Sequence, residues 1–136
     1  MHFRNHLYVW DDRFLYITPG MTAEVTQRHT VTLLVALDQP GFILGNTEGQ
    51  QQRYQAALVA RQTSRSLDAS QTRLLSLNFD PQSYEYHALG RFLGDKAVRS
   101  VILKPGALSA EKMAQIGSGQ LDPSHLFRLT TELPKA

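Results

Sequence analysis

Hydrophobic positions in the first 80 residues fall into short runs separated by turn-forming residues. The central run is Val31 to Leu37, seven residues without a charge, which the Pro-Gly turn at 38–41 ends. An uninterrupted run of this length, stopped by Pro and Gly, is typical of a strand that is buried on both faces. We therefore expect this strand to lie inside a sandwich or barrel. The polar residues just before it would then lie near whatever the barrel encloses.

The other runs predict a series of short strands. Turn signals recur about every ten residues, which is the spacing of an all-β sandwich or barrel. Beside the central run, the expected strands are residues 7–10, 14–17, 22–26, 42–44, 54–60, 65–69, 74–79 and 98–103. Residues 45–52 are rich in Gly, Asn and Gln and predict an exposed loop.

The pattern changes to helical spacing after residue 80. Pro81 suits the first turn of a helix, and Asp80 can cap its free N–H groups. Apolar residues then recur at helical spacing, so a helix is expected near 81–94. The tail predicts two more helices, one over about 109–116 and one that opens at Asp122.

Leu126, Leu129 and Leu133 share one face of the last predicted helix. A helix this short depends on packing for most of its stability. We expect this leucine stripe to form a dimer contact with a second copy of the chain. The alternative is that it packs on the chain's own barrel.

Composition and charge narrow the function classes. The chain has 136 residues and no cysteine, which excludes disulfides, thiolate metal sites and cysteine nucleophiles. Its 14 Lys and Arg residues against 12 Asp and Glu are scattered from Arg4 to Lys135, without the basic stripe that binding to nucleic acid requires. The charged N-terminus and the lack of a long apolar run predict a cytoplasmic protein with neither signal peptide nor membrane span.

The order of these segments resembles one family of regulators. PGMTAEVTQRHTVTLLVAL is followed by a Gly-bounded loop, then by YQAALVARQTSRSL and LLSLNFDPQS, and the tail holds GQLDPSHLFRLTTEL. This series is similar to the N-terminal cupin-like sensor domain of arabinose-regulator (AraC) family transcription factors. The resemblance implies a mainly β fold with C-terminal helices. A cupin-like β-barrel (a jelly roll, or double-stranded β-helix) would span 1–106, and a helical dimerisation segment 107–136.

The resemblance also implies partners. In that family the barrel binds a small-molecule effector, which is unknown here, and the helices help two protomers pair as a homodimer. The family's two helix-turn-helix units follow the sensor domain, whereas this chain ends at Ala136. We therefore expect DNA to be bound only through a C-terminal domain that is absent here. LDPSHLFRLTTEL superficially resembles part of a helix-turn-helix, but Gly117-Ser118-Gly119 falls where its tight spacing is needed, so a dimerisation helix is preferred.

Departures from the cupin pattern argue against a metal. Cupin-type barrels commonly place a second His two residues before the position of His29, and another in a later strand. Gln27 and Arg65 stand at those places here. One His cannot supply the several ligands that a divalent ion needs, and a permanently protonated Arg repels it. We therefore expect no metal, no cofactor and no enzyme activity.

The same positions predict a ligand-binding site. Arg28 and Arg65 suit an anionic or hydroxylated ligand, to which guanidinium groups donate charge-assisted hydrogen bonds. Gln27 and His29 are expected to line the barrel with them, and Trp10 to wall a pocket. Three of these residues have a simpler alternative: His29 hydrogen-bonded to backbone, Arg65 on the surface, and Trp10 in the core.

Two other function classes stay open at this stage. The chain could be a stand-alone, metal-free cupin-fold enzyme or binding protein for a small polar or sugar-like molecule. It could also be a scaffold barrel that holds no ligand.

Overall fold

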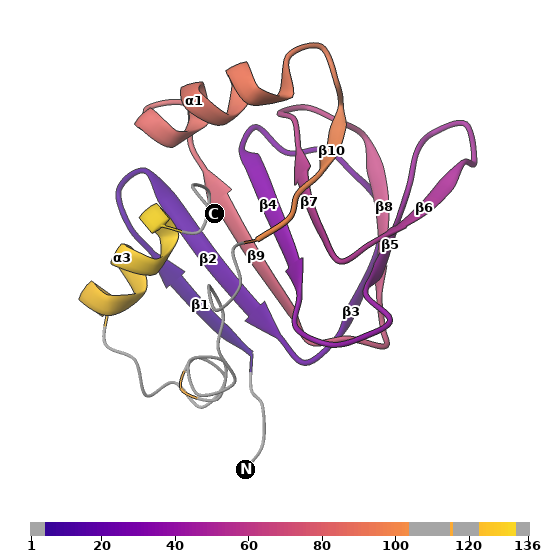
Figure 1. The fold of residues 1–136 in the computed structure, drawn as a ribbon, viewed down its shortest axis with the longest axis horizontal. Helices are drawn as coiled ribbons and strands as arrows, with labels where there is room; N and C mark the ends of the chain where they lie inside the picture. The colour runs from indigo at the N-terminus through magenta and orange to yellow at the C-terminus, as the bar shows by residue number, and fades with distance from the viewer. Residues whose placement is uncertain (1–4, 104–114, 116–122, 133–136) are drawn as a thin grey trace.

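The computed structural model describes residues 5–103, 115 and 123–132. Within them, ten strands form two antiparallel sheets, and helices follow, which confirms the expected mainly β class (Figure 1). The elements in chain order are β1 (His6–Val9), β2 (Arg13–Thr18), β3 (Met21–Thr26), β4 (Val31–Ala36), β5 (Phe42–Gly45), β6 (Gln51–Tyr54), β7 (Ala56–Val59), β8 (Arg65–Ala69), β9 (Leu74–Phe79), α1 (Tyr84–Leu93), β10 (Val98–Ser100) and α3 (Pro123–Glu132).

The strand order is that of a jelly roll. The larger sheet runs β1-β2-β9-β4-β7-β10, and the smaller sheet runs β3-β8-β5-β6. Strands β2 to β9 thus supply four strands to each of two facing sheets, in the pattern of two interlocked Greek keys. Strands β1 and β10 extend the larger sheet at its two edges. The predicted jelly-roll topology is confirmed.

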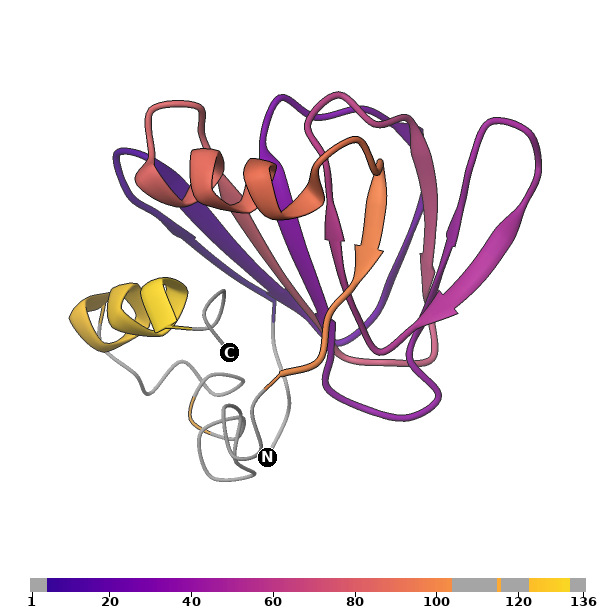
Figure 2. The ribbon, with the colours of Figure 1, turned by 45° about the horizontal axis from the view of Figure 1, so that its top comes forward.

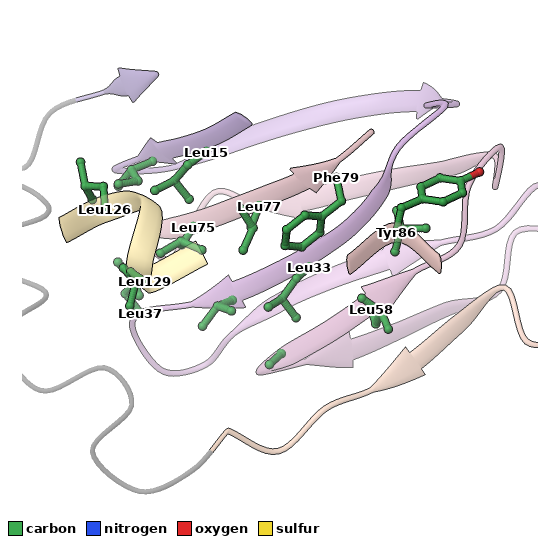
Figure 3. Packing of buried hydrophobic residues seen from close by; sticks show 14 of the residues in the cluster. Leu15, Leu33, Leu37, Leu58, Leu75, Leu77, Phe79, Tyr86, Leu126 and Leu129 are labelled. Atoms are coloured by element: carbon green, nitrogen blue, oxygen red, sulfur yellow. The ribbon is translucent and has the colours of Figure 1, made fainter. Parts of the chain in front are cut away.

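The central strands of the larger sheet, β9, β4 and β7, are buried on both faces. All residues from Val31 to Leu37 are buried, as the sequence predicted. Leu33 and its odd-numbered neighbours face the helices, whereas Leu34 and Ala36 face the smaller sheet. Alternate side chains of a strand point to opposite faces, so a strand between two layers has to be apolar on both. Figure 3 shows the cluster on the helix side of the sheet.

Helix α1 begins three residues later than its predicted cap. Ser83, rather than Asp80, is the N-cap, and its Oγ accepts a hydrogen bond of 3.0 Å from the backbone N–H of Tyr86. Tyr86 and Leu93 are buried against the larger sheet, and Gly94 ends the helix with a φ of 62°. No helix in the described part of the chain is long and apolar enough to cross a membrane.

Helix α3 packs on the chain's own barrel. Leu126 and Leu129 are 0% and 5% exposed and join Leu15 and Leu75 in the cluster on the outer face of the larger sheet (Figure 3). These two leucines therefore make the contact within the chain that was the alternative to a dimer contact, and they cover an apolar face of the sheet. Leu133 lies outside the described residues, and so does the helix predicted over 109–116 except for Gln115.

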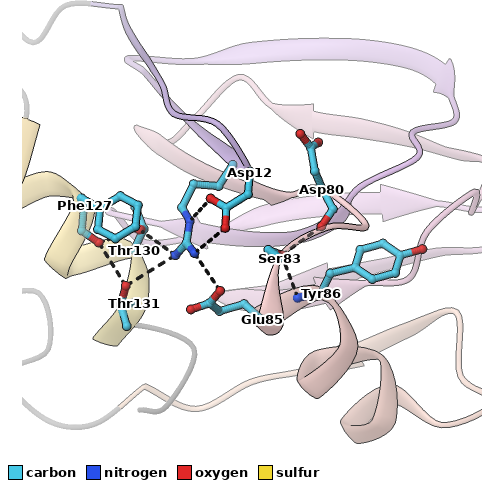
Figure 4. A network of polar contacts seen from close by, with 9 residues as sticks. Asp12, Asp80, Ser83, Glu85, Tyr86, Phe127, Thr130 and Thr131 are labelled. Carbon is cyan, nitrogen blue, oxygen red and sulfur yellow. Dashed lines mark hydrogen bonds and ion pairs between the residues drawn. The ribbon is translucent and has the colours of Figure 1, made fainter.

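Arg13 joins the β1–β2 hairpin to both helices. Its side chain is 4% exposed and donates to the carboxylate of Glu85 in α1 at 2.7 Å and to that of Asp12 at 2.9 Å. It also donates to the Thr130 hydroxyl of α3 at 3.3 Å, and its guanidinium lies 4.5 Å from the ring centre of Phe127. Figure 4 shows these partners around the guanidinium group. Arg13 falls in the gap between the predicted strands 7–10 and 14–17, and the two helices bury it.

The strand predicted over 54–60 falls on two strands in different sheets: the last residue of β6 and the whole of β7. The chain leaves the smaller sheet at Tyr54 and enters the larger one at Ala56. Between them the amide of Gln55 donates to the backbone carbonyl of Asp38 at 3.0 Å, outside either ladder. The loop predicted over 45–52 is shortened accordingly, because β6 begins at Gln51. The last strand is also shorter than predicted and ends at Ser100.

Candidate ligand-binding site

A cavity of about 160 Å³ lies between the two sheets. Strands β2, β4 and β9 supply one wall, and β3 and β8 supply the other. Most of its lining side chains are apolar, with four polar ones among them. The lining residues are Leu7, Phe14, Tyr16, Met21, Ala23, Arg28, Leu34, Arg65, Leu67, Leu74, Ser76 and Asn78.

Arg65 is the buried cation of this cavity. It is the first residue of β8 and is 5% exposed. Burial, and to a smaller extent the nearby positive charge of Arg28, lower the pKa of Arg65 to about 10. The guanidinium therefore stays protonated at neutral pH, although its site disfavours the charge. Two guanidinium groups at one cavity attract an anion, because each offers several N–H donors in a plane.

Hydrogen bonds join the loop after β3, which contains Arg28, to the loop before β8, which leads into Arg65. The side-chain amide of Gln27 donates to the carbonyl of Gln62 at 2.6 Å, and the backbone N–H of Gln62 donates to the carbonyl of Arg28 at 2.6 Å. Gln62 has a φ of 56°, in the left-handed region that a residue other than Gly rarely adopts. The backbone at Arg28 is thus tied to the turn that leads into Arg65.

A polar network forms part of the cavity wall. Asn78 is fully buried, and its Oδ1 accepts hydrogen bonds from the hydroxyls of Thr32 at 2.8 Å and Thr30 at 3.3 Å. Its Nδ2 donates to the Ser76 hydroxyl at 3.1 Å. Buried polar groups need such partners, and here they fix the orientation of an amide and a hydroxyl that both line the cavity. The Asn78 amide is therefore fully paired within the protein, and the Ser76 hydroxyl keeps its own proton to donate to an oxygen of a ligand.

Of the five residues predicted to bind ligand, the structure brings two to this cavity. Arg28 and Arg65 both line it. Gln27 and His29 are exposed and do not line it, and Gln27 instead ties the two loops. Trp10 packs with the cluster on the outer face of the larger sheet, 5.7 Å from the ring of Phe127, so it cannot wall the interior.

Sequence reasoning missed Ser76 and Asn78. In the segment LLSLNF they alternate with Leu75, Leu77 and Phe79, so one face of a buried strand carries polar groups. That alternation was visible in the sequence. It could not show that the polar face meets Arg65, which comes from the opposite sheet.

Metal ligands do not gather in the described residues. No group of three or more His, Asp or Glu side chains lies close enough there to hold an ion. At the position of the cupin pattern that Arg65 fills, a guanidinium has no lone pair to offer a metal. The donor set of this cavity fits an anion better than a cation.

Comparisons with known proteins give only distant likenesses. No family model matches the chain, and no curated protein matches it. Protein NMB1881 from Neisseria meningitidis is similar in structure, with 9% identity and a TM-score of 0.46 over 59% of this chain and 87% of that protein. The oxalate decarboxylase of Lactobacillus farciminis, solved as a formate complex, shows 12% identity and a TM-score of 0.34. A variant of the B. subtilis oxalate decarboxylase shows 10% identity and a TM-score of 0.31.

The two decarboxylase likenesses cover 95% of this chain but only 43% and 38% of the decarboxylases. This chain therefore spans less than half of their length. At such identities and scores, neither activity nor site residues can be transferred from these proteins to this one.

Proposed function

We propose that this chain is the ligand-sensing domain of an arabinose-regulator (AraC) type transcription factor, with an anionic or hydroxylated effector bound inside the jelly roll. One observation carries the ligand-binding part: Arg65 keeps a charged guanidinium at an interior cavity while it is only 5% exposed. Arg28 lines the same cavity, so an anion bound beside both guanidinium groups would accept charge-assisted hydrogen bonds from each of them.

The size of the cavity limits the effector. A cavity of about 150 Å³ lined by apolar side chains can hold a molecule the size of benzene. The cavity of about 160 Å³ therefore suits a small organic acid rather than a nucleotide or a lipid. The carboxylate would lie at Arg65 and Arg28, and a hydroxyl or carbonyl oxygen of the ligand would accept a hydrogen bond from Ser76.

Binding rather than catalysis fits these groups. Arg65 has a pKa of about 10, so it holds its proton at neutral pH and can orient an anion but not shuttle protons. An effector bound to both arginines would favour one arrangement of the linked loops at Arg28 and Gln62. If these loops exchange between two arrangements, the ligand changes the free-energy difference between them by the difference in its binding free energy for each.

The regulatory and dimeric parts of the proposal are supported by the family resemblance of the segments. Since Leu126 and Leu129 are covered within the chain, pairing would use the solvent-facing side of α3, which includes the exposed Arg128. Analytical ultracentrifugation of the chain and of Arg128→Glu tests this pairing. A monomer at every concentration would contradict it. The encoding DNA downstream of Ala136 should specify helix-turn-helix sequence.

Thermal unfolding with small acids tests ligand binding. We expect at least one of acetate, lactate and benzoate to raise the unfolding midpoint, because a ligand that binds only the folded state stabilises it. The neutral amides of the same acids should raise it much less. Arg65→Met should abolish the effect, whereas Arg91→Met, on the exposed side of α1, should preserve it. Flat responses to all the acids, or an Arg65→Met chain that still responds, would overturn the proposal.

A further inference from the structure

A second, larger cavity opens at the edges of the two sheets. Strand β6 ends the smaller sheet and β10 ends the larger one, and the β5–β6 hairpin projects from the sandwich (Figures 1 and 2). These edges border a cleft of about 550 Å³. Its lining residues are Leu44, Gly45, Asn46, Gln50, Gln51, Gln52, Tyr54, Thr63, Ser64, Arg65, Lys96, Ala97 and Val98. Among the described residues, Arg65 alone lines both this cleft and the interior cavity.

The charges of this cleft point to an anion. Arg65 and Lys96 both line it, and they come from opposite sheets, Arg65 opening β8 and Lys96 preceding β10. No Asp or Glu stands among the described residues that line the cleft. Arg65 has a rigid, planar guanidinium, and Lys96 has a flexible side chain with a terminal ammonium. Together they suit a phosphate, which accepts hydrogen bonds on several oxygens.

An aromatic ring stands at the same cleft. Tyr54 is half-buried, and its ring stacks on Phe42 with 6.1 Å between centroids and 29° between planes. Phe42 is fully buried, so the core fixes the Tyr54 ring in place. Fixed aromatic rings are the surfaces on which proteins stack nucleobases, and such stacking is tolerant of base identity.

The glutamines of β6 supply matching hydrogen-bonding groups. Gln51 and Gln52 line the cleft, are exposed, and make no side-chain hydrogen bond within the described residues. A glutamine amide offers a donor and an acceptor side by side, which is the arrangement that pairs with the edge of adenine. Neither residue belongs to the hydrophobic clusters, so folding does not require glutamine at these positions.

We propose that this cleft binds a nucleoside monophosphate. The phosphate would lie between Lys96 and Arg65, the base would stack on Tyr54, and Gln51 or Gln52 would pair with the edge of the base. The volume falls within the range of roughly 300–1,000 Å³ typical of sites for molecules of this size. This site shares Arg65 with the effector cavity, which is too small for a nucleotide, and its other residues are different.

Titration calorimetry with AMP, adenosine, ribose 5-phosphate and inorganic phosphate tests the assignment. AMP should bind saturably and more tightly than any of its three parts, because base and phosphate contacts act together. Lys96→Glu should weaken AMP and ribose 5-phosphate by about tenfold and leave adenosine unchanged, since it reverses one charge at the phosphate. Gln51→Ala combined with Gln52→Ala should weaken AMP and adenosine but not ribose 5-phosphate.

Arg91→Glu is the matched control for charge, because Arg91 is exposed on α1 and does not line the cleft. It should leave AMP affinity within about twofold of the wild type. Any of three results would overturn the proposal. These are the absence of saturable AMP binding, an equal effect of Arg91→Glu and Lys96→Glu, and binding of inorganic phosphate as tight as that of AMP. Ser76→Leu, which fills the interior cavity, should remove stabilisation by small acids and leave AMP binding intact. The two sites can therefore fail independently.

Discussion

Replacing Arg13 with Met should loosen α3 and destabilise the whole fold. Methionine keeps most of the length of the side chain but removes the guanidinium that contacts Glu85, Asp12 and Thr130. The carboxylate of Glu85, 12% exposed, would then lack the partner it has at 2.7 Å. Removing one member of a buried ion pair costs about 3–5 kcal/mol. Since Asp12 is 30% exposed and can be hydrated, we expect the lower end, about 3 kcal/mol.

Glu85→Gln should cost much less than Arg13→Met. Glutamine keeps an oxygen acceptor near Arg13, and Asp12 remains as a charged partner. The expected loss is about 1 kcal/mol, the typical net contribution of one hydrogen bond. The difference between the two variants therefore measures how much of the stability depends on the cation rather than on one carboxylate.

Trp10 provides a local reporter for the assay. It is the single tryptophan of the chain, and its ring lies 5.7 Å from Phe127 of α3. Urea unfolding followed by circular dichroism gives the free energy of unfolding, while Trp10 fluorescence follows the docking of α3. In Arg13→Met, we expect the Trp10 emission to shift to the red in buffer without urea, before the sheets unfold.

Arg91→Met is the control, and its free energy of unfolding should stay within about 0.5 kcal/mol of the wild type. An Arg13→Met chain that also stays within that margin, with unchanged Trp10 emission, would refute this account of the network. If Arg13→Met does not fold, Glu85→Gln and Arg13→Lys still decide the question. Neither should then match the wild type.

Two further changes test other parts of the fold. Arg73 donates hydrogen bonds to Asp38 and holds its pKa below the ordinary value, so this pair stabilises the protein at neutral pH and loses its effect as the pH falls below about 4. Asp38→Asn should cost roughly 1 kcal/mol of stability at pH 7, because the side chains of Asp38 and Arg73 are both about a third exposed, and much less near pH 3. Urea unfolding at the two pH values measures both losses, and an equal loss at each pH would contradict this prediction. Gly41→Ala should cost about 2 kcal/mol or more, because Gly41 has a φ of 84° and an added Cβ would meet the carbonyl of Tyr54. Gly49→Ala is its control, since Gly49 has a similar φ of 81° with open space around it; equal losses would show that backbone strain alone accounts for the effect.

Local periodicity was enough to place most of the elements. Strands β8 and β9 have the bounds that their apolar patterns predicted, helix α1 lies within its predicted range, and β4 is buried on both faces as its unbroken apolar run required. These features depend on residues two to four positions apart, which the sequence displays directly. The break at Gln55 was missed because Tyr54 lies next to the apolar run Ala56 to Ala60, and only the pairing partners show that Tyr54 belongs to the smaller sheet.

By itself the sequence determined a mainly β chain with a doubly buried central strand, and it placed two arginines near the mouth of a barrel. Only the tertiary structure decided that Arg28 and Arg65 share a cavity with Asn78, that Trp10 faces away from it, and that α3 folds back on its own sheet. Arg13 shows the reason. Its neighbours in sequence place it in a turn, but residues more than 70 and 115 positions away bury it and satisfy its charge. Alternation along a strand fixes which side chains share a face, whereas the element that covers this face is fixed only when the chain closes on itself.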